Sequence, residues 1–534
     1  MTNFDPNALI SFIVFLAFIG FTVKRLFTYL HAFQQEEYDG ERFLSWIIRH
    51  RVFDKKFSFV ALLAGIGWFF LDSDLQFIAH LAIVLAFAFV SYFEPDPRKD
   101  SKKKLAFTAR ARRIFFSALF LCIPAGVAAQ LIGIPLLWVL AVQLIPLLLV
   151  AANAFLQPFE NFNQGRFWKE ANQKLVTLSP TVIGVTGSYG KTSVKHILGH
   201  ILSSVAPTLI TPGSVNTPMG IARIVREQLD DTVRYFVVEM GAYGRGSIDR
   251  LCRLAPPDFG IISAIGHAHF ERFKTLETVA ETKFELAQAA LRRDGKVIVH
   301  EKTLRFPYTQ DIRDNHEASF IVTGSAVTNQ LIIEKNVQTL DGLEIDLRWK
   351  DTFYSLNVPL FGLHHTDNIG LAFATACTMG IEPQIVINAL KTVPQVPHRL
   401  EVKKLNKGYL IDDAYNSNPL GFRSALDLLF LVGKKRRKIL ITPGMVELGG
   451  AHDEIHYQIG GLAAESCDIC IAIQPKRIKT FVQGFKEKSR SNQMLLEMES
   501  FAQAQEWLDD NIQDKDLVLI ENDLPDIYER IPKL

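Results

Sequence analysis

Five long apolar segments lie within the first 155 residues of the chain. They cover residues 8–23, 57–70, 75–93, 114–134 and 135–155. A helix needs roughly 17–25 mostly apolar residues to cross a bilayer, so the last three segments are long enough and the first two lie at the short end. The pattern predicts a membrane domain of about five transmembrane helices over residues 1–155. A buried soluble hairpin over 57–93 is the alternative interpretation.

Positive charges predict the orientation of this membrane domain. Basic residues are concentrated after the first apolar segment and before the fourth, whereas residues 72–74, between the second and third, are Asp-Ser-Asp. Because basic loops stay on the cytoplasmic side, we expect the N-terminus outside and everything after the fifth segment in the cytoplasm. The first segment lacks the basic start and the small-residue cleavage site of a signal peptide. The sequence therefore predicts a multi-pass protein of the cytoplasmic (inner) membrane. Its basic loops either only set this topology or also bind anionic headgroups of the lipid bilayer.

From about residue 175 the pattern changes to short apolar runs that alternate with amphipathic helical stretches. Strands alternating with helices predict a parallel sheet with right-handed crossovers, and we assign residues 175–395 to one such domain. Within it, residues 318–361 alternate with period two, which indicates a local antiparallel layer. A proline-punctuated linker at 393–402 precedes a second alternation. The fold class expected is an N-terminal α-helical transmembrane segment followed by α/β, with a smaller Rossmann-like α/β domain over 396–534.

Composition excludes some classes of function. The net charge of +2 gives no general case for nucleic-acid binding. The five cysteines are an odd and sparse set, which argues against a disulfide framework and fits a reducing compartment. Cys467 and Cys470 form a CxxC pair, but no further soft ligands are evident nearby. We therefore expect them to be buried residues of a strand.

The segment GVTGSYGKTSVKHI (184–197) has the features of a phosphate-binding loop between a strand and a helix. In such a loop, backbone N–H groups and a helix N-terminus converge on anionic oxygens. Gly187 and Gly190 allow the tight path, Lys191 reaches the phosphates and the Thr192 hydroxyl can hold Mg²⁺. ATP and Mg²⁺ are therefore the expected cofactors. The residues of this segment expected to contact ATP are Thr186, Gly187, Ser188, Tyr189, Gly190, Lys191, Thr192 and Ser193.

The T-G-x-x-G-K-T spacing resembles that of the Mur ligase family, whose members join amino acids or peptides to cell-wall precursors. The resemblance extends over roughly residues 180–465. Further similar segments are TPGSVNTPMGI (211–221), VVEMGAYGRGSIDRL (237–251), HAHFERFKTLETVAETKFEL (267–286), GLHHTDNIGLAFATA (362–376), PHRLEV (397–402) and DDAYNSNPLGFRSAL (412–426). As a set, these motifs are most similar to those of the D-alanyl-D-alanine-adding members.

The resemblance implies a role for residues well beyond the phosphate loop. The catalytic residues it implies are Lys191, Lys283, His269 and Arg399. The magnesium ligands it implies are Thr192, Glu239, His269 and, if carbamylated, Lys283. The further ATP-binding residues are Asn368, Arg399, Asp413, Tyr415, Asn416 and Asn418. The substrate-side residues are Asn216, Thr217 and Gly220.

Some of these residues have a second interpretation, and some positions depart from the family pattern. His267 and His269, with Glu271, offer a zinc site as the alternative to magnesium, and Lys283 could be an ordinary solvated lysine. Tyr415 could be a core residue instead of stacking on adenine. Departures occur where the family commonly has Thr-Asn, Asn and Gly-Asp. The residues found there are Ser263 and Ala264, His365, and Pro443 and Gly444. The family's N-terminal UDP-sugar-binding domain is missing, and the apolar segments stand in its place.

The chemistry expected is ATP-dependent amide bond formation, of the acid–amino-acid ligase (EC 6.3.2) type. ATP converts a carboxylate into an acyl phosphate, which an amine then attacks, and positioned cations do most of the catalysis. The substrates expected are an envelope precursor, with a lipid-linked acceptor as our hypothesis, and an amino acid or dipeptide. The alternatives are a membrane-anchored poly-amino-acid synthase and a catalytically inactive membrane scaffold. An ATP-driven transporter is disfavoured because the chain has one phosphate loop and few charges in its apolar segments.

Overall fold

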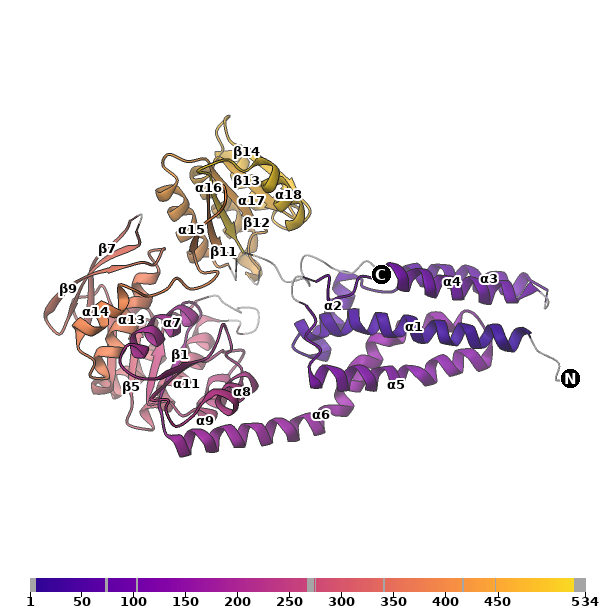
Figure 1. Ribbon diagram of the computed structural model, residues 1–534, viewed down its shortest axis with the longest axis horizontal. Helices are drawn as coiled ribbons and strands as arrows, with labels where there is room; N and C mark the ends of the chain where they lie inside the picture. The colour runs from indigo at the N-terminus through magenta and orange to yellow at the C-terminus, as the bar shows by residue number, and fades with distance from the viewer. Residues whose placement is uncertain are drawn as a thin grey trace. The chain divides into compact units, whose positions relative to one another are not determined.

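The computed structural model describes residues 6–72, 75–101, 104–266, 273, 275–339, 341–414, 417–446 and 448–522. The chain divides into a helical unit, which includes residues up to Asn163, and an α/β unit that begins at Gln164 (Figure 1). The predicted fold class, a helical N-terminal region followed by α/β domains, is confirmed.

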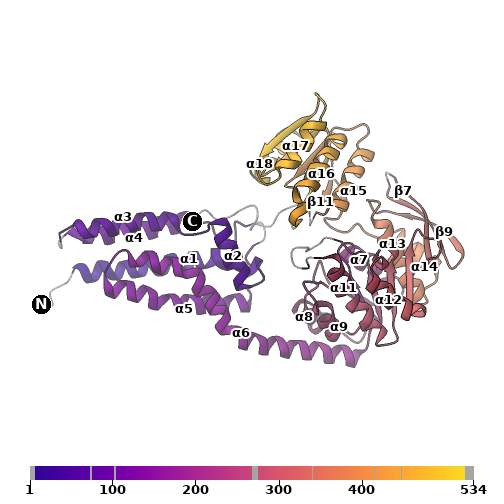
Figure 2. The ribbon, with the colours of Figure 1, turned by 180° about the vertical axis from the view of Figure 1, so that it is seen from behind.

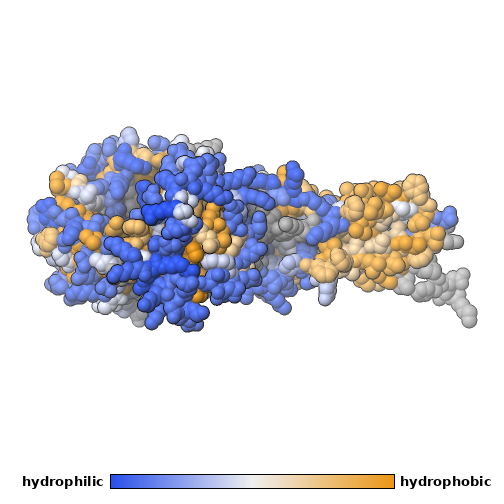
Figure 3. Space-filling model, turned by 90° about the horizontal axis from the view of Figure 1, so that it is seen from above, coloured by the Kyte–Doolittle hydropathy of each residue, from blue (hydrophilic) through white to orange (hydrophobic). Residues whose placement is uncertain are grey.

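All five apolar segments form helices. The helical unit contains α1 (Pro6–Gln35), α2 (Gly40–His50), α3 (Lys55–Phe70), α4 (Phe77–Phe93), α5 (Ala109–Ile132) and the first part of α6 (Leu137–Leu178). Among the described residues, α1, α5 and α6 are long and apolar enough to cross a membrane, whereas α3 and α4 have 16 and 17 residues. Figure 3 shows the apolar surface of this unit, and exposed phenylalanines such as Phe70, Phe89 and Phe120 contribute to it.

A buried ion cluster joins three helices of this unit. The first apolar segment ends at residue 23, but α1 continues through Arg25, which is 1% exposed. Its guanidinium contacts Asp54 Oδ2 at 2.8 Å and Glu94 Oε1 at 3.6 Å. Asp54 caps α3, Glu94 follows α4, and the Thr28 hydroxyl donates to Glu94 at 2.5 Å. A buried charge needs such partners, so Arg25 can lie in the core of the unit.

The first sheet of the α/β unit has nine strands in the order β2-β3-β1-β4-β5-β6-β7-β8-β9. The strands are β1 (Thr181–Thr186), β2 (Thr208–Ile210), β3 (Tyr235–Glu239), β4 (Phe259–Ile262), β5 (Lys296–His300), β6 (Phe320–Gly324), β7 (Leu331–Gln338), β8 (Leu343–Trp349) and β9 (Thr352–Val358). Pairing is parallel from β2 to β7 and antiparallel from β7 to β9. The predicted parallel sheet is therefore confirmed. The predicted antiparallel layer is confirmed for β7 to β9, whereas β6, which also lies within 318–361, pairs in parallel.

Helices cover both faces of this sheet. They are α7 (Lys191–Ser203), α8 (Pro218–Gln228), α9 (Ser247–Leu254), α11 (Leu276–Leu291), α12 (Pro307–Asn315), α13 (His365–Thr378) and α14 (Pro383–Leu390). One core contains α7, α13 and α14, and a second core on the other face contains α8, α9 and α11 (Figures 1 and 2). Alternation along β1 explains the two cores, because Val182 belongs to one and Ile183 to the other.

The second sheet has six strands in the order β10-β11-β15-β12-β13-β14, and only its β10–β11 pair is antiparallel. The strands are β10 (Glu401–Lys404), β11 (Tyr409–Asp413), β12 (Lys438–Thr442), β13 (Ile469–Ile473), β14 (Met494–Met498) and β15 (Leu517–Glu521). The helices are α15 (Pro419–Val432), α16 (His452–Ser466), α17 (Lys479–Lys488) and α18 (Phe501–Asn511). Cys467 and Cys470 are both buried, as predicted, but only Cys470 lies in a strand, β13, whereas Cys467 is the C-cap of α16.

Candidate active site

The phosphate loop connects the buried end of β1 to the first turn of α7. Its two glycines are required by close contacts. A Cβ atom at Gly187 would lie 1.9 Å from Ser263 Oγ, and one at Gly190 would lie 2.3 Å from Asn368 Oδ1. Gly190 also has a left-handed φ of 81°. A larger side chain at either position would displace these groups, so the glycines let the loop pass close to Ser263 and Asn368.

The segment after β4 holds the loop in this conformation. The Ser188 N–H donates to Ala264 O at 2.7 Å, and the Ser188 hydroxyl donates to Gly266 O at 3.0 Å while accepting from Gly266 N at 2.9 Å. The Ser263 hydroxyl donates to Thr186 O at 3.2 Å and also contacts Tyr189 O. Ser263 is one of the departures from the family pattern, and the structure gives it a direct role in fixing the loop.

Two lysines point into a small cavity beside the loop. Its lining includes Lys191, Asn216, Phe273 and Lys283. The Lys191 ammonium donates to Gly187 O at 2.8 Å, and burial lowers the pKa of Lys191, with the charge of Arg399 lowering it further. Lys283, on α11, is 4% exposed. Burial and the neighbouring Lys191 charge hold the pKa of Lys283 well below its ordinary value. The interpretation of Lys283 as a solvated surface lysine is therefore wrong.

Glu239, at the end of β3, is the acidic centre of the site and is 1% exposed. Its carboxylate accepts from Thr192 Oγ1 at 2.9 Å and from Asn216 Nδ2 at 3.1 Å. It also pairs with the Lys195 ammonium at 3.2 Å. Glu239 thus draws the phosphate loop and the 211–221 segment together, which explains why Thr192 and Asn216 meet although they are distant in sequence.

Lys195 is a site residue that the sequence reasoning missed. It is fully buried, one helical turn after Lys191 on α7, and its ammonium also donates to Gly213 O. Burial lowers the pKa of Lys195, although its partner Glu239 opposes this shift. The signal was available in the sequence, because a lysine four residues after Lys191 shares its face of the helix.

Helix α13, the linker and the second domain supply further predicted residues. Asn368, on α13, faces Gly190, and its amide lies 3.4 Å from His365 Nδ1. Burial lowers the pKa of Lys191 and of His364, and the charge of Arg399 lowers both further. It also acts on Asp413, at the end of β11, where burial raises the pKa to about 6 against the lowering effect of Arg399.

Glu521 is a second residue that the sequence reasoning missed. It ends β15 directly beside Asp413 in the parallel β11–β15 pair, and it is fully buried. Its carboxylate accepts from the Ser417 hydroxyl at 2.5 Å. Burial and the adjacent Asp413 raise the pKa of Glu521. Nothing in the local sequence around residue 521 marks it, because its partners come from a strand about a hundred residues earlier.

Other predicted residues have structural partners or lie outside the described residues. Thr217 caps α8 by accepting from Gly220 N at 3.4 Å, and Asn418 caps α15 by accepting from Gly421 N at 3.0 Å. Ser193 is buried in the first turn of α7. The predicted residues that lie outside the described part of the chain are His269, Tyr415 and Asn416, and also His267 and Glu271 of the zinc alternative.

The donor set that does lie in the described part fits a nucleotide with Mg²⁺. The glycine backbone and the N-terminus of α7 suit phosphate oxygens, and Lys191 and Lys195 bring positive charge close to them. Thr192 and Glu239 offer the hard oxygen ligands that Mg²⁺ prefers. Cations outnumber carboxylates among these described residues, which suits a polyanion.

Comparison with known proteins identifies both α/β domains. The Mur ligase middle domain matches residues 185–376, and the Mur ligase, glutamate ligase domain matches residues 398–521. The UDP-N-acetylmuramoyl-tripeptide–D-alanyl-D-alanine ligase of Bacillus subtilis is 29% identical over 296 residues, which are 55% of this chain and 62% of that protein. The enzyme of the same name from Mycobacterium tuberculosis is 30% identical over 305 residues, which are 54% of this chain and 57% of that protein. The chain thus spans about three fifths of the length of these relatives.

Solved structures give the same fold. The MurF ligase of Thermotoga maritima in complex with ADP aligns with a TM-score of 0.59 at 24% identity, covering 69% of this chain and 81% of that one. A MurF structure from Acinetobacter baumannii aligns with a TM-score of 0.60 at 24% identity, covering 67% and 77%. Through its middle and C-terminal domains, the chain belongs to the Mur ligase family.

Proposed function

We propose that the protein is an ATP-dependent acid–amino-acid ligase that forms an amide bond on a cell-wall precursor through an acyl phosphate. The observation that carries this proposal is the arrangement of Thr192, Glu239 and Asn216 beside Lys191 and Lys283 at the phosphate loop. The names of the relatives support D-alanyl-D-alanine as the added group and a muramoyl tripeptide as its acceptor.

Each residue of the site has a task that its chemistry suits. ATP and Mg²⁺ together would supply the phosphoryl group that activates a carboxylate. Lys191 and the N-terminus of α7 hold phosphate oxygens, and Arg399 adds a second cation from the linker. Thr192 and Glu239 hold the metal, with Lys195 and Asn216 fixing the carboxylate of Glu239. Asn216 also accepts from the Tyr243 hydroxyl at 3.1 Å, so the substrate-side segment is anchored at the metal-binding residue.

Lys283 is poised for modification by carbon dioxide. Only a neutral amine attacks CO₂, and the product is a carbamate anion with release of one proton. Burial and the neighbouring Lys191 charge lower the pKa of Lys283, which increases the fraction of neutral amine at any given pH. The carbamate would bring negative charge to a site where Lys191 and Lys195 carry positive charge, and could help to hold a second Mg²⁺.

We further propose that the acceptor is lipid-linked and that the enzyme works at the cytoplasmic face of the inner membrane, with its N-terminus outside. Three long apolar helices and the basic residues near them support this location. The domain limits that accompany it are a membrane domain over 1–155, an ATP-binding domain over 175–395 and a second α/β domain over 396–534. The match to the Mur ligase domains begins at residue 185, after the helical part of this chain, which supports a different way of presenting the acceptor.

The test uses the full chain, purified in detergent, with ATP, Mg²⁺ and either D-alanyl-D-alanine or single amino acids. Two acceptors are compared: the soluble UDP-linked tripeptide and the same peptide on a polyprenyl diphosphate carrier. ADP release and the mass of the amide product are measured, with the Lys191→Ala variant as control. Faster ligation on the lipid carrier supports the full proposal. Full activity on the soluble acceptor, with no gain from the carrier, overturns the lipid-linked part.

The same assay separates the alternatives. Repeated addition of one amino acid would indicate a poly-amino-acid synthase. ATP binding without ADP release, for every amine and acceptor tried, would indicate an inactive scaffold and contradict the proposed ligase activity.

A further inference from the structure

The segment that carries Arg399 is a folded turn and not an open linker. The Gln395 side-chain amide bonds both backbone groups of Val402, accepting from its N–H at 2.7 Å and donating to its carbonyl at 3.3 Å. The Arg399 N–H donates to Val396 O at 3.1 Å. Hydrogen bonds within the turn therefore contribute to fixing the path of the chain through Arg399.

The residues on both sides of Arg399 adopt left-handed backbone conformations. His398 has a φ of 58° and Leu400 a φ of 51°. This region is uncommon for residues other than glycine, and it persists where the surroundings over-determine it. Such a pair of conformations around one arginine raises the question of what holds them.

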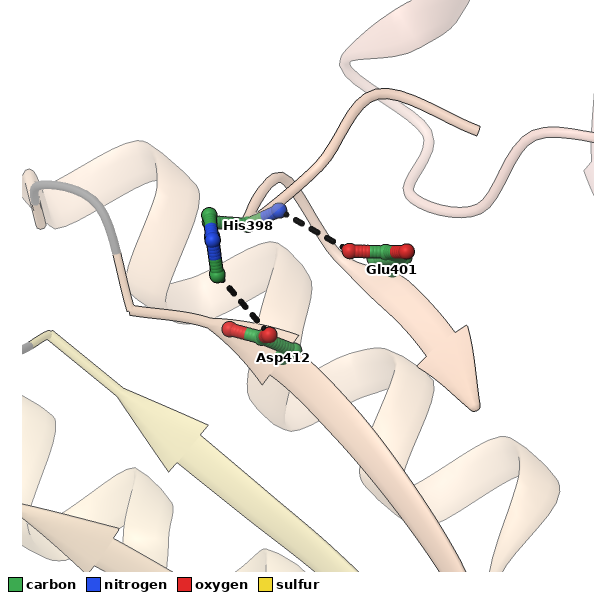
Figure 4. A group of neighbouring side chains, drawn as sticks. All are labelled: His398, Glu401 and Asp412. Carbon is green, nitrogen blue, oxygen red and sulfur yellow. Dashed lines mark hydrogen bonds and ion pairs between the residues drawn. The ribbon is translucent and has the colours of Figure 1, made fainter. Parts of the chain in front are cut away.

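Two consecutive aspartates on β11 provide the restraints. His398 Nδ1 lies 2.9 Å from Asp412 Oδ2, and the His398 N–H donates to Glu401 Oε2 at 3.1 Å (Figure 4). On the other side of Arg399, the Leu400 N–H donates to Asp413 Oδ1 at 3.2 Å. Side chains alternate along a strand, so Asp412 and Asp413 reach opposite faces and each holds one neighbour of Arg399.

A cation already occupies the centre of this group. Glu401 and Asp412 lie directly opposite each other in the β10–β11 pair, where two like charges would repel. The Lys403 ammonium contacts both carboxylates at 2.8 Å. The ligand atoms of His398, Glu401 and Asp412 lie within 4.8 Å of one another, a spacing that would also suit a metal ion. Because Lys403 supplies the positive charge, a role in shaping the turn explains the group better than metal binding.

We propose that His398 is a positioning residue whose contact with Asp412 fixes the turn so that Arg399 is directed to the phosphate loop. The contact is a latch between the linker and β11, and it acts only through Arg399. This inference rests on the proposed function, in which Arg399 contacts the transferring phosphate.

Substitutions at His398 distinguish the effect of losing the His398–Asp412 contact from the effect of the left-handed backbone conformation at this residue. His398→Ala removes the contact with Asp412 and keeps a Cβ atom. His398→Gly also removes the contact but relieves the left-handed φ. His398→Asn keeps a side-chain N–H near the position of Nδ1, and asparagine tolerates this φ. We expect kcat to fall about tenfold or more in the alanine and glycine variants, with a smaller change in the KM for ATP, because misplaced groups slow the reaction itself. The asparagine variant should retain activity within about threefold of the wild type.

A double-mutant cycle with Arg399→Ala tests whether His398 acts through Arg399. All variants are made in the full chain, and their melting temperatures are compared first. In the Arg399→Ala background, His398→Ala should cause no further loss. An equal loss in both backgrounds would overturn the proposal, and so would a glycine variant as active as the wild type.

Direct titration with Mg·ATP separates this proposal from the proposed function. If the wild type releases no ADP with any acceptor, the ligase proposal fails, and the same cycle is then evaluated from the Kd for ATP. The latch predicts weaker ATP binding in His398→Ala and no additional weakening in the double variant. If the changes in Kd from His398→Ala and Arg399→Ala add up in the double variant, the positioning role of His398 is contradicted. That result does not bear on the ligase proposal.

Discussion

Two buried charge clusters, one in each unit of the molecule, differ in their balance. In the helical unit, Arg25 contacts both Asp54 and Glu94, so every charge has an opposite partner within the cluster. At the phosphate loop, Lys195 pairs with one described carboxylate, that of Glu239, while Lys191 and Lys283 line the neighbouring cavity. In the first cluster every charge touches an opposite one, although carboxylates outnumber the guanidinium two to one. In the second, three lysines stand against one described carboxylate, and only Lys195 pairs with it.

This difference separates a structural role from a binding role. A paired buried cluster holds α1, α3 and α4 together, and its groups keep ordinary opposite-charge contacts. An unbalanced cluster costs stability unless a ligand of the opposite sign completes it. Burial lowers the pKa values of Lys191 and Lys283, and the Lys191 charge lowers that of Lys283 further. Excess charge that the fold itself does not neutralise is therefore the better indicator of a site for a polyanion.

The largest effect is expected from Lys191→Ala. If Lys191 contacts the transferring phosphate, as the proposed function requires, its removal should lower kcat by about 10⁴-fold, which corresponds to about 5 kcal/mol. Because Lys191 is one of several excess cations, the folded state should lose little, and the melting temperature should stay within a few degrees. ADP release and calorimetry measure the two quantities. A large loss of stability with modest loss of activity would reverse the assignment of the two clusters.

Arg25→Met should have the opposite signature. It leaves Asp54 and Glu94 buried without their cation, which is expected to destabilise the helical unit by about 3–5 kcal/mol. Hydrogen exchange of peptides from α1 and α4 measures the loss, while the Kd for ATP should stay unchanged.

The matched control for Arg25 neutralises the whole cluster. In the triple variant Arg25→Met, Asp54→Asn and Glu94→Gln, no buried charge remains unpaired, and asparagine caps a helix about as well as the aspartate that it replaces. Most of the lost stability should return. A triple variant as unstable as Arg25→Met would show that packing, and not charge, explains the effect.

Local pattern predicted much of the fold and part of the site. The apolar runs predicted the helices, the strand-loop-helix context predicted the phosphate loop, and period two predicted the β7–β9 layer. These features depend on neighbours in sequence. The resemblance added residues such as Glu239 and Lys283, which the fold brings to the same loop.

Contacts between distant residues could not be predicted in this way. Ser263 fixes the phosphate loop from more than seventy residues away, and Glu521 meets Ser417 across 104 residues. The Arg25 cluster joins residues from three helices, so α1 continues through a position that the hydropathy pattern placed in a basic loop. In each case the partner depends on which strands or helices pack together, and a single sequence does not state this.

Lys283→Ala tests whether a carbamate on Lys283 offsets the positive charge at the phosphate loop. If Lys283 carries a carbamate, its loss removes an anion at the site, and kcat should fall about 10²-fold. A small carboxylate such as acetate should restore part of the activity of this variant and none of the activity of Lys191→Ala. ADP release with and without acetate measures this. A fully active Lys283→Arg variant, with no effect of acetate on the alanine variant, would exclude the carbamate.

The smallest expected effect is on the pH dependence of stability, through Asp412 and Asp413. These neighbours on β11 differ in environment, because cationic partners contact Asp412 whereas Asp413 is buried beside Glu521. Burial raises the pKa of Asp413 to about 6, against the charge of Arg399. Burial would also raise that of Asp412, but hydrogen bonds from Lys403 and His398 hold the Asp412 pKa below its ordinary value. The folded state therefore keeps a proton on Asp413 that the unfolded chain releases between about pH 4 and pH 6.

The sign of the pH dependence follows from these shifts. The contribution of Asp413 to stability is present below about pH 4 and is lost as the pH rises through 6, by about 2–3 kcal/mol. The contribution of Asp412 is present above its ordinary pKa and is lost as the pH falls. Hydrogen exchange of β11 and β15 peptides, without nucleotide and corrected for the intrinsic rate, should show faster opening at about pH 7 than at about pH 4.5. Asp413→Asn should remove most of this change, and Asp412→Asn should leave it in place. Equal slopes in both variants would mean that the proton is held elsewhere, with Glu521 as the remaining carboxyl of the pair.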